Sequence, residues 1–293
     1  MKPTAVLILA CLASVVAQDL APHRVFDATR AAFGEFDPMI DDLAAADVVF
    51  VGEQHDSANT HRLELALLQA IGRRRGDVVL SLEMFERDVQ EPLDHFLMGH
   101  AAEDEFLKDA RPWPRYRTDY KPLVDLAVAK EWPVVAANVP RSIASEVSKG
   151  GLDVLQAKSA ADRRLFAGDL QCPTDDVYFK RFGEAMGDHS GTAGTTTHFY
   201  YAQCLKDETM AESIAQAYTI AAMGGKRPLV VHINGAFHSD FGQGTAARAR
   251  RRLPGKRVVV VSMLPVEQMD VQAPDAAERR RGDFLIYTVA GKN

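Results

Sequence analysis

Two histidines of this chain stand in the same sequence context, and a glutamate stands in a similar one. His55 ends the segment 52–55, Gly-Glu-Gln-His, and His238 ends the segment 235–238, Gly-Ala-Phe-His; each segment follows an apolar run. Glu83 follows a third apolar run. Imidazole and carboxylate groups can bind a divalent metal ion such as zinc, transfer protons to and from a substrate, or form a hydrogen-bonded network that only shapes a pocket. The residue types alone leave these three interpretations open.

A second group of candidate residues is aromatic and basic. Tyr116 and Tyr120 lie in the segment 111–122, together with arginines, a lysine and prolines. Because proline disfavours a helical conformation at the residue before it, we expect both tyrosines to lie in or beside an exposed loop. A tyrosinate can ligate ferric haem iron, and Arg117 with its basic neighbours could lower the phenol pKa or pair with haem propionates. The alternative is an aromatic cluster that only packs this loop onto the protein.

Two other histidines are weaker candidates. His61 falls on a predicted helix, and we expect its side chain to face solvent. His232 lies inside an apolar strand, where a hydrogen-bonded core histidine is the simpler interpretation. The sequence contains no glycine-rich phosphate loop, no G-x-S-x-G elbow and no H-E-x-x-H helix, so these signatures offer no other active site.

Six short apolar runs predict the buried strands that position these candidates. They cover residues 47–51, 78–82, 133–137, 229–233, 258–263 and 284–289. Apolar residues at helical spacing predict helices between them, including one around residues 63–71 and one at 124–130. Strands that are apolar on both faces and alternate with helices indicate an α/β fold, with a mostly parallel sheet and helices on both faces. Such sheets bind ligands beyond the carboxyl ends of their strands, so we expect the candidates to meet there.

One segment interrupts the alternation of strands and helices. Residues 152–223 show a helical pattern with a Gly/Thr-rich stretch near 187–197, and we expect a helical insertion over the C-terminal ends of the strands. The insertion contains Cys172 and Cys204. In an oxidising compartment these two cysteines would form a disulfide, which would lower the entropy of the unfolded insertion. Two free buried thiols are the alternative.

The N-terminal segment predicts export. A lysine at position 2, an apolar run at 5–16 and small residues before position 18 indicate a signal peptide of residues 1–17. Residues 18–293 would then form a single α/β domain in the periplasm or at the outer membrane. In the alternative interpretation Cys11 is lipidated, and the protein is held at the periphery of a membrane.

Composition limits the class of partner. Lys and Arg total 34 against 40 Asp and Glu, which gives a net charge of −6, and the arginines cluster only in short runs. A mildly acidic chain without a basic face argues against nucleic acid as a partner. Hydrophobic residues make up 47% of the 293 residues, which is enough for a large buried core.

Six segments of the chain together resemble one family. They are residues 51–56, 82–87, 120–123, 136–141, 202–211 and 234–238. In this order they are similar to segments of the ChaN-like haem-binding uptake proteins. That family shares a superfamily with the Tiki/TraB proteins and the erythromycin esterases. The resemblance spans residues 49–238, most of the chain after the N-terminal segment.

The resemblance implies an exported or lipid-anchored protein that binds haem and takes part in haem and iron uptake. It implies ligation of the haem iron by tyrosine, and Tyr120 is our candidate because it matches the family's Y-x-P-L segment. The residues expected to contact haem are Tyr120, Tyr116, Arg117, His55, His238 and Arg141. A haem receptor or transporter is the implied partner, and an exposed haem face favours a homodimer.

The wider superfamily implies an alternative function. In a metal-dependent hydrolase, His55, His238 and Glu83 would hold a divalent metal ion or perform acid–base chemistry, and Glu53 would assist them. A third hypothesis is a non-catalytic α/β module that binds an unknown small molecule or protein. Haem affinity distinguishes the first hypothesis from the other two, and metal content distinguishes the second from the third.

Overall fold

A single mixed sheet forms the centre of the protein. The computed structural model describes residues 20–187 and 193–291. Its strands are β1 (His23–Asp27), β2 (Ala32–Gly34), β3 (Val48–Glu53), β4 (Val78–Glu86), β5 (Val134–Asn138), β6 (Leu229–Gly235), β7 (Val258–Val266) and β8 (Phe284–Val289). They lie in the order β2-β1-β8-β7-β3-β6-β4-β5. Strands β3 to β8 pair in parallel, whereas β1 pairs antiparallel with β2 and β8.

The six predicted strands are confirmed as β3 to β8, and the mostly parallel α/β class with them. Strands β1 and β2 were not predicted from the sequence. These two strands have five and three residues, and β2 is largely exposed. Strand β1 contains the polar residues His23, Arg24 and Asp27, and β2 has only three residues, so neither forms an apolar run long enough to indicate a strand.

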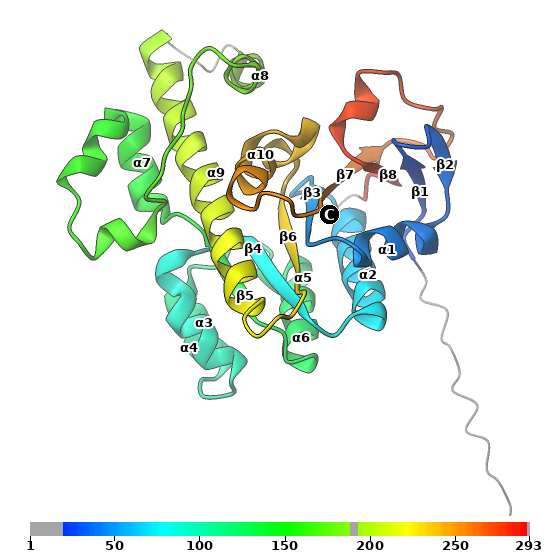
Figure 1. Ribbon diagram of the computed structural model, residues 1–293, viewed down its shortest axis with the longest axis horizontal. Helices are drawn as coiled ribbons and strands as arrows, with labels where there is room; N and C mark the ends of the chain where they lie inside the picture. Colours follow the sequence, from blue (N-terminus) through cyan, green and yellow to red (C-terminus); the bar gives the residue numbers. More distant parts are fainter. Residues whose placement is uncertain (1–19, 188–192, 292–293) are drawn as a thin grey trace, which may run out of the picture.

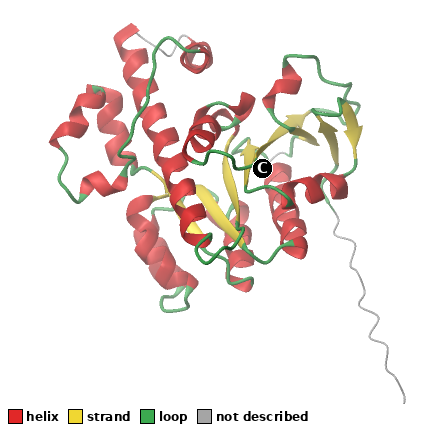
Figure 2. Ribbon diagram, viewed as in Figure 1, coloured by secondary structure: helices red, strands yellow, loops and turns green. Residues whose placement is uncertain are grey.

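Helices cover both faces of the sheet (Figures 1 and 2). The helices that precede β5 in the chain are α1 (Phe36–Ala44), α2 (Ala58–Arg74), α3 (Gln90–Leu97), α4 (Glu103–Ala110), α5 (Tyr116–Asp119) and α6 (Lys121–Ala129). They pack on the face that carries Val49 and Val51 of β3. On the opposite face, Val48 and Phe50 pack against α9 (Ala193–Ala221) and α10 (Gly244–Arg252). Alternate residues of one strand therefore enter two separate cores, as the apolar runs predicted.

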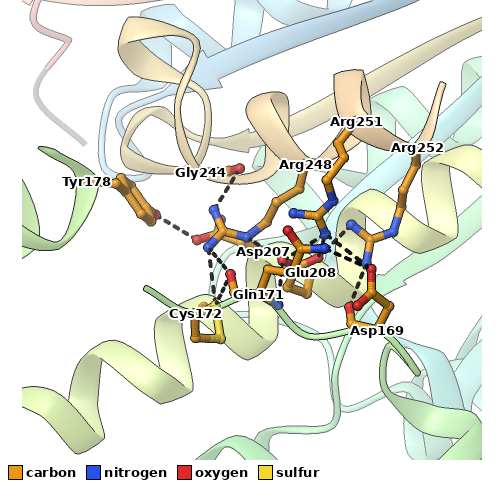
Figure 3. The surroundings of a disulfide bond; sticks show 11 residues. Asp169, Gln171, Cys172, Tyr178, Asp207, Glu208, Gly244, Arg248, Arg251 and Arg252 are labelled. Atoms are coloured by element: carbon orange, nitrogen blue, oxygen red, sulfur yellow. Dashed lines mark hydrogen bonds and ion pairs between the residues drawn. A yellow bond between two sulfur atoms is a disulfide. The ribbon is translucent and has the colours of Figure 1, made fainter. Parts of the chain in front are cut away.

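The predicted insertion is helical and contains the predicted disulfide. It begins after α7 (Arg141–Gly150) and comprises two 3-10 turns, α8 (Val177–Met186) and α9. The C-terminal half of α9 covers the sheet, whereas its N-terminal half and α8 lie beyond the strand ends (Figure 1). Cys172 and Cys204 are bonded at an S–S distance of 2.08 Å. The bridge ties the segment before α8 to α9 (Figure 3).

The expectation of an exposed loop around Tyr116 and Tyr120 is wrong. Helix α5 contains Tyr116, α6 begins directly after Tyr120, and the two side chains are 4% and 1% exposed. Pro122 lies in the first turn of α6, where the backbone N–H that proline lacks would have no partner within the helix. The other two prolines precede α5, so none of them interrupts a helix.

The predicted signal peptide and Cys11 lie outside the described residues. Within the described residues, none of the helices combines the length and the apolar character that crossing a membrane requires.

Candidate functional site

A cleft lies at the carboxyl ends of β3 and β6, beneath α8. Its volume is about 860 Å³, within the range of about 300–1,000 Å³ that small-molecule and cofactor sites occupy. The residues that line it include Glu53, His55, Arg181, Phe182, Met186, Gln203, Phe237, His238, Phe241 and Arg281. The cleft therefore combines an apolar, aromatic wall with two arginines and two histidines.

His55 is the accessible histidine of this cleft. Its side chain is 45% exposed, and its Nδ1 lies 2.5 Å from Oε1 of the buried Glu53. Its Nε2 lies over Gly235, where an added Cβ would come within 2.7 Å of that nitrogen. Glycine at the end of β6 therefore leaves the space that His55 occupies. Among the described residues, no hydrogen-bond partner of Nε2 is found, so this nitrogen is available to a ligand.

The carboxylate of Glu53 interacts with three side chains, those of His55, Tyr120 and His61. Besides His55 it accepts a hydrogen bond from the Tyr120 hydroxyl at 2.8 Å, and its Oε2 lies 3.1 Å from His61 Nδ1. Burial alone would raise the pKa of Glu53, but the bonds from His55 and His61 hold that pKa below its ordinary value. Burial and the Glu53 charge raise the pKa of Tyr120, so the phenol keeps its proton. The arginines near Tyr120 do not produce the lowered phenol pKa that the sequence suggested.

His238 lies deeper and uses both ring nitrogens. Its Nδ1 is 2.7 Å from Asp207 Oδ1, and its Nε2 is 3.3 Å from Glu83 Oε1. Burial lowers the pKa of His238, but the two carboxylates overcome this effect and raise the pKa to about 10. Burial likewise opposes ionisation of Glu83, yet the charge of His238 and its hydrogen bond lower the pKa of Glu83 to about 2. At neutral pH the group is an imidazolium between two carboxylates.

This ion cluster predicts how stability depends on pH. The stabilisation from His238 is complete below its unfolded pKa of 6.5 and is lost as pH rises toward 10. The stabilisation from Glu83 is complete above its unfolded pKa of 4.5 and is lost as pH falls toward 2, by about 3 kcal/mol in total. We therefore expect both contributions to be complete between pH 4.5 and 6.5. Urea unfolding at a series of pH values measures the free energy of unfolding. In Glu83→Gln this free energy should fall less than in the wild type as pH drops below 4.5. An equal fall in both proteins would contradict the prediction.

Asp207 anchors the insertion to the site. It accepts hydrogen bonds from the hydroxyls of Tyr178 on α8 and Thr245 on α10, at 2.7 and 2.8 Å, as well as from His238. Figure 3 shows the bond from Tyr178, with Arg248 beside it. Because Asp207 is fully buried, solvent screens its charge only weakly. Asp207 was not predicted as a site residue, because it lies in the middle of the long helix α9 and its partners are distant in sequence.

His61 is buried, and the expectation that it faces solvent is wrong. It is 4% exposed and lies beside Glu64, which is 0% exposed. The two residues are spaced i, i+3 on α2 and therefore share one face of the helix. A signal was present in the sequence, because Glu64 precedes the apolar Leu67 and Leu68 by three and four residues. His232 is buried as expected, with its Nδ1 2.8 Å from the Ser81 hydroxyl.

Some predicted haem contacts lie away from the cleft. Arg117 is 63% exposed and pairs with Asp104, and Arg141 is 71% exposed at the start of α7. Tyr116 packs in the core against Phe85. The structure thus brings Glu53, His55, Glu83 and His238 together, with Tyr120 behind Glu53, and separates Tyr116, Arg117 and Arg141 from them.

Two arginines of the cleft were not among the predicted contacts. Arg181 on α8 lies over the rings of Phe237 and Phe241, with its guanidinium carbon 4.4 and 4.7 Å from the ring centroids. Arg281 pairs with Asp240 at 2.7 Å. Their partners come from the segment after β6, so no local sequence pattern connects them to the histidines.

Comparison with known proteins identifies the family. The model of the haem-binding uptake family ChaN, of the Tiki superfamily, matches residues 39–249. The chain belongs to this family. The matched range includes Glu53, His55, Glu83, Tyr120 and His238, so the family resemblance found in the sequence is confirmed.

Individual relatives of this ChaN-family chain are distant. Protein RETICULATA-RELATED 5, chloroplastic, of Arabidopsis thaliana is 26% identical over 269 residues, which is 85% of this chain and 35% of that protein. The chain thus spans about a third of the length of that curated relative. A structure of cofacial heme binding to ChaN of Campylobacter jejuni has a TM-score of 0.67 at 17% identity and covers 90% of this chain and 96% of the other, which shows the shared fold. An erythromycin esterase mutant in its open conformation has a TM-score of 0.46 at 10% identity, covering 92% and 83%.

Proposed function

We propose that this chain binds haem in the cleft at the ends of β3 and β6 and serves haem or iron uptake. One observation carries the proposal: a chain of the ChaN family places the accessible imidazole of His55 in the wall of an aromatic cleft. The cleft volume of about 860 Å³ lies within the range of cofactor sites and suits haem.

The donor set of the cleft fits haem. Haem needs an apolar surface for its ring, cations for its propionates and an axial donor for its iron. Phe182, Phe237 and Phe241 supply the apolar surface, and Arg181 and Arg281 supply the cations. A guanidinium can form two parallel hydrogen bonds with one carboxylate, so each arginine suits a propionate.

His55 is the iron ligand that requires the least rearrangement. Glu53 accepts from its Nδ1 and so leaves Nε2 as the donor atom, which is the arrangement found around metal-binding histidines. Tyr120, the ligand that the family resemblance suggested, stays a second proposal. Its hydroxyl would have to leave Glu53, lose its proton and reach the cleft from a position that is 1% exposed.

Export, transfer of haem to a receptor or transporter, and haem-linked pairing of two copies form the wider part of this proposal. The predicted signal peptide supports export. ChaN of Campylobacter jejuni binds heme cofacially, which is an arrangement that two copies of this chain could share.

A ferric haem titration of the full chain tests the proposal. We expect saturable binding of one haem per chain, seen as a shifted absorbance spectrum. Arg181→Ala should lower the affinity about tenfold, because one charged hydrogen bond contributes about 1.5–3 kcal/mol. Arg117→Ala is the matched control, since this exposed arginine lies outside the cleft. Light scattering on the same samples reports haem-linked pairing. An absence of saturable binding, or a loss for Arg117→Ala alone, would overturn the proposed site.

A further inference from the structure

A second cluster of ligand-type side chains lies on the sheet side of α2, beside the haem cleft. Glu53, His61 and Glu64 each place one ligand atom so that all three lie within 4.8 Å of one another. The three side chains are at most 4% exposed. Burial sets this group apart from the acidic clusters that are common on protein surfaces, because a buried carboxylate costs free energy unless a proton or a cation compensates its charge.

The distances suit a metal ion between the three groups. His61 Nδ1 lies 3.1 Å from Glu53 Oε2 and 3.1 Å from Glu64 Oε2. Ligands at about 2.0–2.2 Å from a tetrahedral zinc ion lie about 3.3–3.6 Å apart. The two distances from His61 are close to this range, and the ligand atoms of Glu53 and Glu64 lie within 4.8 Å of each other.

The surroundings of His61 are those of a metal ligand. Its other nitrogen, Nε2, lies 3.2 Å from the backbone oxygen of His55, to which it can donate its proton. A metal-binding histidine commonly makes such a bond, which fixes the tautomer and leaves the opposite nitrogen free to coordinate. Glu53 is oriented in the same way, because the Tyr120 hydroxyl occupies its Oε1 and leaves Oε2 toward His61.

An unpartnered oxygen gives independent support. Glu64 is 0% exposed, and among the described residues its Oε1 has no hydrogen-bond partner. Buried polar atoms without a partner are rare in folded proteins and call for a proton, a water or an ion. A second cleft, of about 530 Å³, is lined by His61 of the cluster and by Thr118 and Asp119 of α5.

We propose that Glu53, His61 and Glu64 bind one divalent transition-metal ion, of which Zn²⁺ and Mn²⁺ are the representatives to test. Imidazole and carboxylate ligands suit both ions. The ion would fix Glu53, which in turn positions His55 at the haem cleft. This inference is separate from the proposed function, because metal binding needs none of the cleft residues other than Glu53.

The test is metal content and affinity of the full chain without haem. After chelation and dialysis against Zn²⁺ or Mn²⁺, we expect about one equivalent per chain by elemental analysis, and a higher melting temperature with metal than without. Glu64→Gln keeps the shape of the side chain and removes its charge, so it should weaken binding about 100-fold or more, since even outer partners of a metal site contribute about 10–100-fold. Glu146→Gln is the matched control, because Glu146 is half exposed on α7.

Each outcome decides between a metal ion and a shared proton. If the cluster holds only a proton, the wild type retains less than a tenth of an equivalent and its melting temperature does not respond to metal. Equal binding by Glu64→Gln would also overturn the proposal. Should Glu64→Gln fail to fold, the absorption spectrum of Co²⁺ added to the wild type reports nitrogen and oxygen ligation, and its absence overturns the proposal. Haem titration of the metal-free and the metal-loaded samples side by side shows whether the proposed function fails in both, which the metal content by itself does not decide.

Discussion

Replacing His55 with alanine should lower the affinity for ferric haem about 100-fold or more and shift the absorbance spectrum of the remaining complex. The reason is that, of the two histidines that line the cleft among the described residues, His55 offers an accessible ring nitrogen, while His238 has both nitrogens between buried carboxylates. Loss of an outer partner of a metal-binding histidine costs about 10–100-fold, so loss of the ligand itself should cost at least as much. Absorbance titration of the variant and the wild type side by side gives both quantities.

Tyr120→Phe is the decisive companion variant. If His55 ligates the iron, Tyr120→Phe should keep the wild-type spectrum and stay within a few-fold of the wild-type affinity, because Phe fills the same buried space. If Tyr120 ligates the iron, as the family resemblance implied, Tyr120→Phe should lose more haem affinity than His55→Ala and should be the variant whose spectrum changes. An unchanged affinity in both variants would place the iron elsewhere.

Asp207→Asn should lower the free energy of unfolding by about 3–5 kcal/mol, which is the cost of removing one partner from a buried ion pair. Asp207 accepts from His238, Tyr178 and Thr245, all of which are buried. An asparagine keeps the volume but offers one acceptor oxygen and no charge, so His238 would keep its proton with Glu83 alone.

Chemical denaturation at pH 6 measures this effect, within the range where the ion cluster is complete. Asp169→Asn provides the control, because Asp169 is 68% exposed and its pair with Arg251 is long, at 3.7 Å. Exposed pairs contribute about 0–1 kcal/mol. A loss below about 1 kcal/mol for Asp207→Asn would show that Asp207 does not stabilise the imidazolium of His238.

The sequence was most informative where burial leaves a local pattern. Strands such as β3 and β6 are enclosed on both faces, so their apolar runs predicted them and the polar residues at their ends. Strand β2 is mostly exposed and left no such pattern. The position of His55 and His238 at one end of the sheet could be predicted because both follow a buried strand.

The remaining site residues depend on contacts between distant segments. The prolines around Tyr120 favour a loop when they are read as helix breakers, but Pro122 lies where a helix begins and is compatible with it. Arg181 reaches the cleft because α8 folds over Phe237, a contact across 56 positions of sequence. The environments of His61 and Asp207 likewise form only when helices pack on the sheet. Such contacts follow from tertiary packing. The spacing of Glu64 before Leu67 and Leu68 indicates that this face of α2 is buried, but it does not predict the partners of His61.

The central position of β3 determines when the cleft can form during folding. Val48 of β3 pairs with Val230 on one side and Val258 on the other, so neither neighbour of this strand comes from the first two hundred residues. Loop closure over such distances is slow, and sheets rich in distant pairings fold late. On a ribosome, His55 is synthesised early but meets Gly235 only after three quarters of the chain has emerged. The histidine and the glycine that makes room for it therefore come together late, and a chain cut short before β6 has no cleft at all.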